Sequence, residues 1–537
     1  MNDIRRWGWV LTTAMLLSVS AALATDSPMF RGGLGHSGAA EEIGNPPVLA
    51  WRWTGKTATP NNESAPAVVG NTIYFGAGTV FMAIDAENGA KKWQYPADAG
   101  IGGTFKTAPA VQNGIVYVGT GEGNLYALTA DTGRLLWIAS VRSPINSSPV
   151  VADGKVFFGA NNGTLYAVDA KNGNMIYTKG AFQTSDYIHS SPIYNEGMVV
   201  LSSNDGYVYG VLASSAKAKW ATRMPATTTD NSPILAAGRI YVGSGSNLFA
   251  LNPSSGRTYW VKAFSSEVAQ SPTANDNSVF VITNENKVYA FENTGKTLWK
   301  KPIILSYAPA ASATVAGNML IVPQRRGMIS MYDIATGELK WQYTIRPLPS
   351  NAVNAAPRQD YVNITTSPVV ANGTLYILTD NGELIAFSTL KGVDVTSPEV
   401  EYVLPEAGES MPGQPPLEIT AKINDEGSGI NPSTVKLFLD EEALSCDFDS
   451  TKGLISYKFL VSQTNKPWSD GRHNLRLEAS DWAGNKLNKT WSVMVDNSLK
   501  RAAKRRYQGP TPGISTPGAN PSNPYGRPGN TPNYPGR

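Results

Sequence analysis

The chain has 537 residues, among them 51 glycines, 36 prolines and a single cysteine, Cys446, and its 45 basic and 42 acidic residues give a net charge of +3. The length allows two folded modules, and the glycine and proline content is typical of turn-dense β-structure. One cysteine excludes an intramolecular disulfide framework. The three histidines, His36, His189 and His473, lie in unrelated segments, so there is little material for a histidine metal site or a Ser-His-Asp triad.

Residues 1–24 have the pattern of an export signal. Arg5 and Arg6 precede a short apolar run at residues 10–17, and small residues at 22 and 24 precede the expected cleavage site. The alternative is an uncleaved membrane anchor, which the shortness of the apolar run disfavours. We therefore expect an exported protein, periplasmic, cell-surface or secreted, with no transmembrane segment after cleavage. Residues 25–45 are expected to be a lead-in segment.

Residues 46–392 repeat one unit eight times at a period of about 40 residues. The third unit illustrates its pattern, with strand-like runs at 148–152, 155–159, 164–169 and 174–179 separated by turns such as Asp153-Gly154. Four antiparallel strands per unit are typical of a propeller blade, and the absence of a 3.6-residue period excludes helical repeats. The last unit lacks its fourth strand, and residues 48–53 supply a spare one. Pairing the two closes an eight-bladed β-propeller and removes its open edges.

The units also carry versions of a phrase of the form Ala-x-Asp-x-x-x-Gly-x-x-x-Trp, which is intact from Ala83 to Trp93. Several units depart from it: Tyr177 replaces the tryptophan, residues 213–216 have lost the Asp and the Gly, and residues 292–299 are one residue short. This phrase resembles the tryptophan-docking motif of the PQQ-type propellers, a family that includes the quinoprotein alcohol dehydrogenases and the outer-membrane assembly lipoprotein BamB. The resemblance covers about two thirds of the chain and implies that the aromatic ring packs between neighbouring blades. The expected docking residues, one per blade, are Trp53, Trp93, Trp137, Tyr177, Trp220, Trp260, Trp299 and Trp341.

The dehydrogenases of this family hold their quinone against two adjacent, disulfide-linked cysteines, so the resemblance implies that a quinone-binding chain would carry such a pair. The chain has only Cys446, which lies outside the repeats. We expect no catalytic residue, no cofactor and no metal, and a non-catalytic scaffold that binds a protein or peptide, with a BamB-like role as one version. A cofactor- or sugar-binding propeller, such as a PQQ-dependent dehydrogenase that uses the central channel, is the alternative. No cysteine follows the signal core, so the lipid attachment of BamB itself is not expected here.

Residues 393–497 form a different module, with alternating strand-like runs at 417–423, 434–439, 454–460, 473–479 and 489–495. The spacing predicts a β-sandwich of about 100 residues. Its turn phrases resemble those of bacterial Ig-like domains, which implies a spacer or adhesive role. An acidic turn at Asp425 and Glu426 offers ligands for Ca²⁺, but an ordinary solvated turn is the favoured interpretation.

The remaining residues, 498–537, have seven basic and no acidic side chains and are rich in proline and glycine. This composition predicts a disordered tail. Because the net positive charge of the chain is confined to this segment, we expect contact with an acidic envelope polymer or a membrane surface, and no nucleic acid for an exported chain. A tail that only keeps the protein soluble is the simpler alternative.

Two places in the propeller depart from the regular repeat and are predicted to bind the partner. The turn at Arg325 and Arg326 carries charge where the neighbouring units have Gly, Asn or Ser. The connection at 342–366 is the longest, and it contains Arg346, Arg358 and Tyr361.

Overall fold

The computed structural model describes residues 26–55, 65–177, 180–226, 231–348, 361–390, 392–460 and 466–499. The expected signal segment and the basic tail, with Arg358, lie outside these ranges. Within them the only helical element is the 3₁₀ turn η1 (Pro432–Thr434), so the predicted all-β class is confirmed. No helix in the described ranges is long and apolar enough to cross a membrane.

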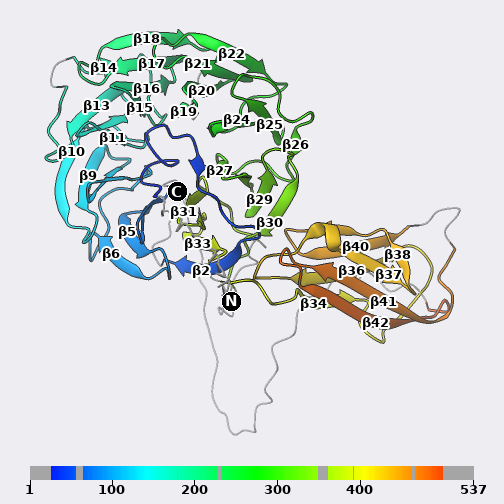
Figure 1. Ribbon diagram of the computed structural model, residues 1–537. Helices are drawn as coiled ribbons and strands as arrows, with labels where there is room; N and C mark the ends of the chain where they lie inside the picture. Colours follow the sequence, from blue (N-terminus) through cyan, green and yellow to red (C-terminus); the bar gives the residue numbers. More distant parts are fainter. Residues whose placement is uncertain are drawn as a thin grey trace, which may run out of the picture.

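Eight sheets are arranged around the ring that Figure 1 shows. The first four blades are β3 (Ala67–Val69), β4 (Thr72–Ala77), β5 (Val80–Asp85), β6 (Lys91–Tyr95); β7 (Ala110–Gln112), β8 (Ile115–Gly119), β9 (Asn124–Thr129), β10 (Leu135–Ser140); β11 (Val150–Ala152), β12 (Lys155–Gly159), β13 (Thr164–Asp169), β14 (Phe182–Gln183); and β15 (Ile193–Asn195), β16 (Met198–Ser203), β17 (Tyr207–Leu212), β18 (Ala218–Arg223). The next three are β19 (Ile234–Ala236), β20 (Arg239–Ser244), β21 (Asn247–Leu251), β22 (Thr258–Ala263); β23 (Thr273–Ala274), β24 (Ser278–Ile282), β25 (Lys287–Glu292), β26 (Ile303–Ile304); and β27 (Thr314–Ala316), β28 (Met319–Pro323), β29 (Met328–Asp333), β30 (Leu339–Thr344).

The last blade joins the two ends of the repeat region. It consists of β31 (Val369–Ala371), β32 (Thr374–Leu378), β33 (Glu383–Ser388) and, as its outer strand, β2 (Val48–Thr54), which pairs antiparallel with β33. The spare strand predicted at 48–53 is therefore the one that completes this sheet. Every residue of β24, in the middle of its blade, is buried, whereas β22 on the rim is mostly exposed. The middle strands read as continuous apolar runs because blades pack on both of their faces.

The fourth strand predicted at residues 174–179 is wrong over 174–177, the part of it that the structure describes. Met175 makes only an isolated bridge to Val168, and the outer strand of this blade is the two-residue β14 further along. Gly180, with a φ of 79°, lies between the bridge and the strand, and a residue in that left-handed conformation interrupts a straight ladder. The predicted hairpin turn in the same blade is present, since Asp153 and Gly154 have φ values of 49° and 71°.

The docking phrase can be explained residue by residue. The Asp position caps its own turn, as Asp85 does by accepting hydrogen bonds from the backbone of Glu87 and Asn88. The Gly position of the phrase adopts a positive φ, which is 69° at Gly133. A Cβ added there would lie 2.3 Å from the ring of Trp93, so the position has no room for a side chain. The aromatic residue then donates to the backbone carbonyl that follows the Asp position of the next blade. The pairs are Trp93 to Ala130, Tyr177 to Ala213, Trp220 to Pro253, Trp260 to Asn293 and Trp299 to Ile334, at 2.7–3.0 Å.

The closing blade corrects one of the expected docking residues. Trp51, not Trp53, donates to the carbonyl of Ala86 in the first blade, at 3.2 Å. Trp53 instead packs edge-on against Phe75, with ring centroids 5.3 Å apart. The two tryptophans are two positions apart and lie on the same face of the strand, so alternation does not distinguish them. The pairing register does: Trp51 pairs with Ala386 just after a bulge, as Trp93 pairs with Ala83 in the first blade.

Trp137 is a second departure within the ring. Its indole nitrogen is buried and has no hydrogen-bond partner among the described residues. The carbonyl in the equivalent position of the next blade, Ala170, accepts from the hydroxyl of Tyr117 at 2.9 Å instead. This ring therefore contributes packing without the hydrogen bond.

The lead-in segment runs across the middle of the ring, as the blue trace in Figure 1 shows. Its backbone bonds to the inner strands of six blades: the carbonyls of Ser27, Pro28, Leu34, Gly35, Ser37 and Gly38 accept from Val68, Val111, Tyr194, Leu235, Ala274 and Val315. The segment ends in β1 (Ala39–Ala40), which pairs parallel with β27. Residues 27–40 therefore occupy the ring axis.

The second module is a sandwich of two sheets. One contains β34 (Glu399–Leu404), β36 (Leu417–Asn424), β40 (Leu454–Phe459) and β39 (Asp447–Asp449), and the other contains β35 (Ser410–Met411), β42 (Lys486–Val495), β41 (Gly471–Ser480), β37 (Lys436–Leu439) and β38 (Glu442–Leu444). Inner residues such as Ile419, Leu475 and Trp491 form its core. We refer to this module as the sandwich domain.

Candidate functional site

The junction between propeller and sandwich domain uses the propeller's own docking device. Trp341 belongs to the seventh blade and is fully buried, yet its indole N–H donates to the carbonyl of Ser428 in the sandwich domain, at 2.9 Å, and not to the eighth blade. In return, Trp482 of the sandwich domain donates to the carbonyl of Gln342 at 3.0 Å. Tyr343 adds a hydrogen bond from its hydroxyl to the carbonyl of Glu426. The junction thus replaces the interblade hydrogen bond, while the Trp341 ring still packs edge-on against Phe387 of the eighth blade, with centroids 5.5 Å apart.

The ring axis is filled by side chains of the lead-in segment. Arg31 is buried and donates to the carbonyls of Pro272 and Ala313 and to the hydroxyl of Thr273, at 2.5–3.2 Å. Burial lowers the pKa of Arg31 to about 9. His36 is also fully buried, and burial, followed by the nearby charge of Arg31, lowers the pKa of its imidazole to about 3, so it is neutral. The segment therefore links neighbouring blades around the ring axis.

The turn of Arg325 and Arg326 connects β28 to β29 and is exposed. Arg326 has a φ of 63°, and its backbone N–H donates to the side chain of Asn363. Its guanidinium lies over two aromatic rings, 4.8 Å from the centroid of Tyr307 and 5.7 Å from that of Tyr361. The structure therefore brings together three of the predicted partner-binding residues, with Tyr307 as a member that sequence reasoning missed.

Arg346, from the same prediction, lies elsewhere. It donates to the side chain of Asn424 at 2.6 Å and lies 3.5 Å from the carboxylate of Glu401, so its guanidinium is held in the junction. Arg358 lies outside the described residues. Of the five residues predicted to bind a partner, the structure therefore groups only Arg325, Arg326 and Tyr361 on one surface.

A cavity of about 120 Å³ lies in the junction and is lined by residues of both domains, including Arg52, Tyr343, Arg346 and Asp425. Small-molecule sites usually measure roughly 300–1,000 Å³, so this space is too small for a multi-ring cofactor.

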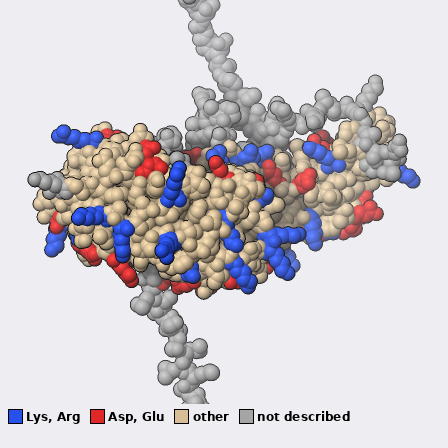
Figure 2. Space-filling model, turned by 90° about the horizontal axis from the view of Figure 1, so that it is seen from above, with Lys and Arg blue, Asp and Glu red and all other residues tan. Residues whose placement is uncertain are grey.

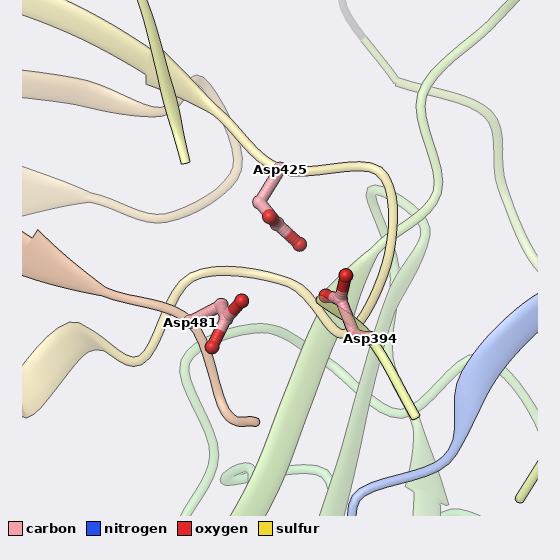
Figure 3. Close-up of side chains that lie close together, drawn as sticks. All are labelled: Asp394, Asp425 and Asp481. Carbon is pink, nitrogen blue, oxygen red and sulfur yellow. The ribbon is translucent and has the colours of Figure 1, made fainter. Parts of the chain in front are cut away.

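Three carboxylates meet beside this cavity. Oxygen atoms of Asp394, Asp425 and Asp481 lie within 4.8 Å of one another (Figure 3). Burial, followed by the charges of the other two, raises the pKa of Asp425 to about 6, although the backbone N–H of Gly429 opposes the shift. The sequence singled out Asp425 with Glu426, whereas the structure places Asp425 with two aspartates distant in sequence. Carboxylate oxygens are suitable ligands for Ca²⁺, so this is the described group that could hold a metal ion.

A Ser-His-Asp arrangement occurs in the sandwich domain, although sequence spacing gave no sign of it. The Nδ1 atom of His473 lies 2.5 Å from the Asp440 carboxylate, and Nε2 lies 2.8 Å from the carbonyl and 3.5 Å from the hydroxyl of Ser469. Because a carbonyl only accepts, Nε2 carries a proton and cannot serve as a general base for the hydroxyl. The group is a charged clamp and not a catalytic triad.

Charge on the rim is mixed. Basic side chains are spread over the surface that Figure 2 shows, with acidic side chains between and around them. Recognition by charge therefore depends on local groups of residues and not on a broad field of one sign.

Comparisons with known proteins identify the family. A family model described as outer membrane protein assembly factor BamB matches residues 76–234 and 227–406, more than half of the chain, and the chain belongs to this family of PQQ-like repeat propellers. BamB of Yersinia pestis is 28% identical over 196 residues, which cover 34% of this chain and 49% of that protein. BamB of Moranella endobia is 27% identical over 203 residues, covering 35% and 51%. The chain spans about half the length of these curated relatives.

Quinoproteins are also similar. The dehydrogenase subunit of a quinone alcohol dehydrogenase from Gluconacetobacter polyoxogenes is 34% identical over 104 residues, 18% of this chain and 14% of that protein. The structure of BamB from Moraxella catarrhalis aligns with a TM-score of 0.51 and 17% identity, covering 64% of this chain and 97% of that one. A europium-containing methanol dehydrogenase aligns with a TM-score of 0.56 and 14% identity, covering 68% and 98%. At these identities the structural likeness shows the fold alone.

The residues present do not fit the quinone of the dehydrogenases. The chain's single cysteine, Cys446, belongs to the sandwich domain, so the adjacent pair that the resemblance implies is missing from the propeller. The ring axis holds Arg31 and the neutral His36. We therefore derive no chemistry through that cofactor.

Proposed function

We propose that this protein is a non-catalytic scaffold of the bacterial cell envelope, exported and acting by protein or peptide binding. The finer version is a BamB-like role in outer membrane protein assembly. The observation that carries the proposal is the occupied ring axis: residues 27–40 bond to six blades there, and the exposed loops on the ring faces remain for binding. Membership of the BamB family supports the same role.

The sandwich domain gives the scaffold a fixed second arm. Its two reciprocal tryptophan hydrogen bonds, from Trp341 and Trp482, are buried or half-buried and would keep the orientation of the two domains constant. A partner that contacts both domains would meet one preformed surface, which lowers the entropic cost of binding. The basic tail remains a proposed tether to an acidic envelope polymer or membrane surface.

The proposal is tested by deleting the gene in its source bacterium and measuring the amounts of β-barrel proteins in the outer membrane. We expect a reduction that the full-length gene restores. The purified chain is titrated in parallel with pyrroloquinoline quinone and Ca²⁺, with calorimetry and a dye-linked alcohol oxidation assay as readouts. Unchanged outer-membrane composition together with stoichiometric quinone binding and alcohol oxidation would overturn the scaffold and establish the quinoprotein alternative.

A further inference from the structure

One turn of the propeller differs in chemistry from its equivalents in the other blades. The turns between the second and third strands of the other blades contain no basic residue, whereas the seventh has Arg325 and Arg326 side by side. Both are exposed, and no carboxylate among the described residues lies within ion-pair distance of either. Two adjacent unpaired guanidinium groups form a local site for anionic groups.

The turn is held in position by its neighbours. Arg325 donates its backbone N–H to the carbonyl of Ala308, and Arg326 donates to Asn363, so the connections on both sides fix the turn. The rings of Tyr307 and Tyr361 then hold the Arg326 guanidinium through cation–π contacts. A group that is already oriented loses little freedom when it binds, which favours a specific contact over a diffuse one.

The same surface continues onto the sandwich domain. The hydroxyl of Tyr307 lies 3.3 Å from that of Thr451, and the next residue, Lys452, is exposed and pairs only at the surface with Asp449, at 3.6 Å. Three basic side chains from two domains therefore border one stretch of surface beside the junction. Solvent weakens such an exposed pair, so Lys452 remains available to a second anion.

We propose that this surface binds an acidic, extended peptide segment of the partner, with carboxylates on Arg325 and Arg326 and a further one near Lys452. The inference rests on the proposed scaffold function and names the chemistry of its partner. A peptide is favoured over a lipid surface because the basic group is small and has Asp380 and Asp449 nearby, whereas a membrane attracts a broad basic field. Guanidinium groups match the planar geometry of carboxylates in two-point hydrogen bonding.

The test uses the chain from residue 25 to 537 and a fluorescein-labelled decapeptide rich in glutamate, with binding followed by anisotropy. We expect the double variant R325A/R326A to bind about tenfold more weakly, and the difference to shrink at high salt. The matched control is R134A/R257A, which removes two exposed arginines from turns on the other side of the blades and should leave binding unchanged. A lysine decapeptide should not bind at either place.

The basic tail could capture the same probe, so a third variant changes its five basic residues between 500 and 506 to glutamine. Retention of most of the affinity in this variant supports the arginine surface, and loss in this variant alone overturns it. Vesicles containing 30% anionic lipid form the other arm: if R325A/R326A weakens vesicle binding but not peptide binding, the ligand is a lipid headgroup and the peptide proposal is wrong. Failure of the scaffold function itself would be seen separately, as unchanged outer-membrane composition in the deletion strain.

Discussion

Replacing Trp341 with phenylalanine should loosen the junction between propeller and sandwich domain. The indole is fully buried, stacks against Tyr343 at 5.8 Å and donates to the carbonyl of Ser428, which is itself buried. Loss of the donor leaves that acceptor unpaired, which costs roughly 1–3 kcal/mol, and the smaller ring adds about 1 kcal/mol for lost packing. A cost of about 2–4 kcal/mol corresponds to an increase of roughly 30-fold to several hundredfold in the opening constant of the junction.

Amide hydrogen exchange of residues 425–429, followed by mass spectrometry, measures that opening. The matched control is Trp93→Phe, because Trp93 makes the same bond to Ala130 between two blades and should destabilise the ring without changing exchange at 425–429. Equal exchange in Trp341→Phe and the parent chain would refute the view that the docking bond fixes the sandwich domain. A change of the same size in Trp93→Phe would refute its local character.

Three further predictions follow from buried or coupled charges. Arg31→Ala removes three hydrogen bonds at the ring axis and should lower the free energy of unfolding by about 3 kcal/mol, with faster protease cleavage within residues 26–40; unchanged cleavage would contradict the role of this side chain. His473→Gln should cost about 1 kcal/mol near pH 5.5 and less near pH 9, by urea unfolding. Burial lowers the pKa of His473, but hydrogen bonds to Ser469 and Asp440 outweigh burial and raise that pKa. The imidazolium therefore stabilises the fold fully below the unfolded pKa of histidine, and this stabilisation is lost as pH rises through the folded-state pKa. In the presence of EDTA, Asp425→Asn should stabilise the folded chain at pH 8 by about 1 kcal/mol after allowance for solvent screening, and should have no effect below pH 4. The pKa of Asp425 is raised to about 6 in the folded state, so this carboxyl lowers the free energy of unfolding as pH rises from its unfolded pKa to about 6. A variant less stable than the parent chain at pH 8 would refute this sign.

The sequence was sufficient for the repeat, for the closing strand and for five of the nine strands that the structure describes in the second module, because turn residues and alternating apolar runs are local signals. It was insufficient where position depends on register or on interrupted pairing. Trp51 and Trp53 are two positions apart on the same face of β2, and the pairing of Trp51 with Ala386 decides which one reaches the next blade. The fourth strand at 174–179 had a strand-like composition, yet Met175 forms a bridge alone.

The candidate site shows a similar limit. Arg325 and Arg326 could be singled out because their turn breaks a local pattern, whereas Tyr307 comes from another blade connection and meets them only in the folded ring. Arg346 could be singled out only because its connection is long, and its guanidinium is held by the sandwich domain. The group of Asp394, Asp425 and Asp481 joins a linker and two turns, and no spacing in the sequence brings these positions together.

The lead-in segment also had no repeat signal, and its role follows from what a propeller ring leaves open. The inner strands of eight blades present backbone groups to the axis, and a segment that crosses the axis can satisfy them without strict periodicity. Here six blades bond to residues 27–38, and Arg31 ties the sixth and seventh blades through Pro272 and Ala313. A propeller closed in this way has its exposed loops and its second domain left for recognition, which is why the arginine turn beside the sandwich domain is the surface to test first.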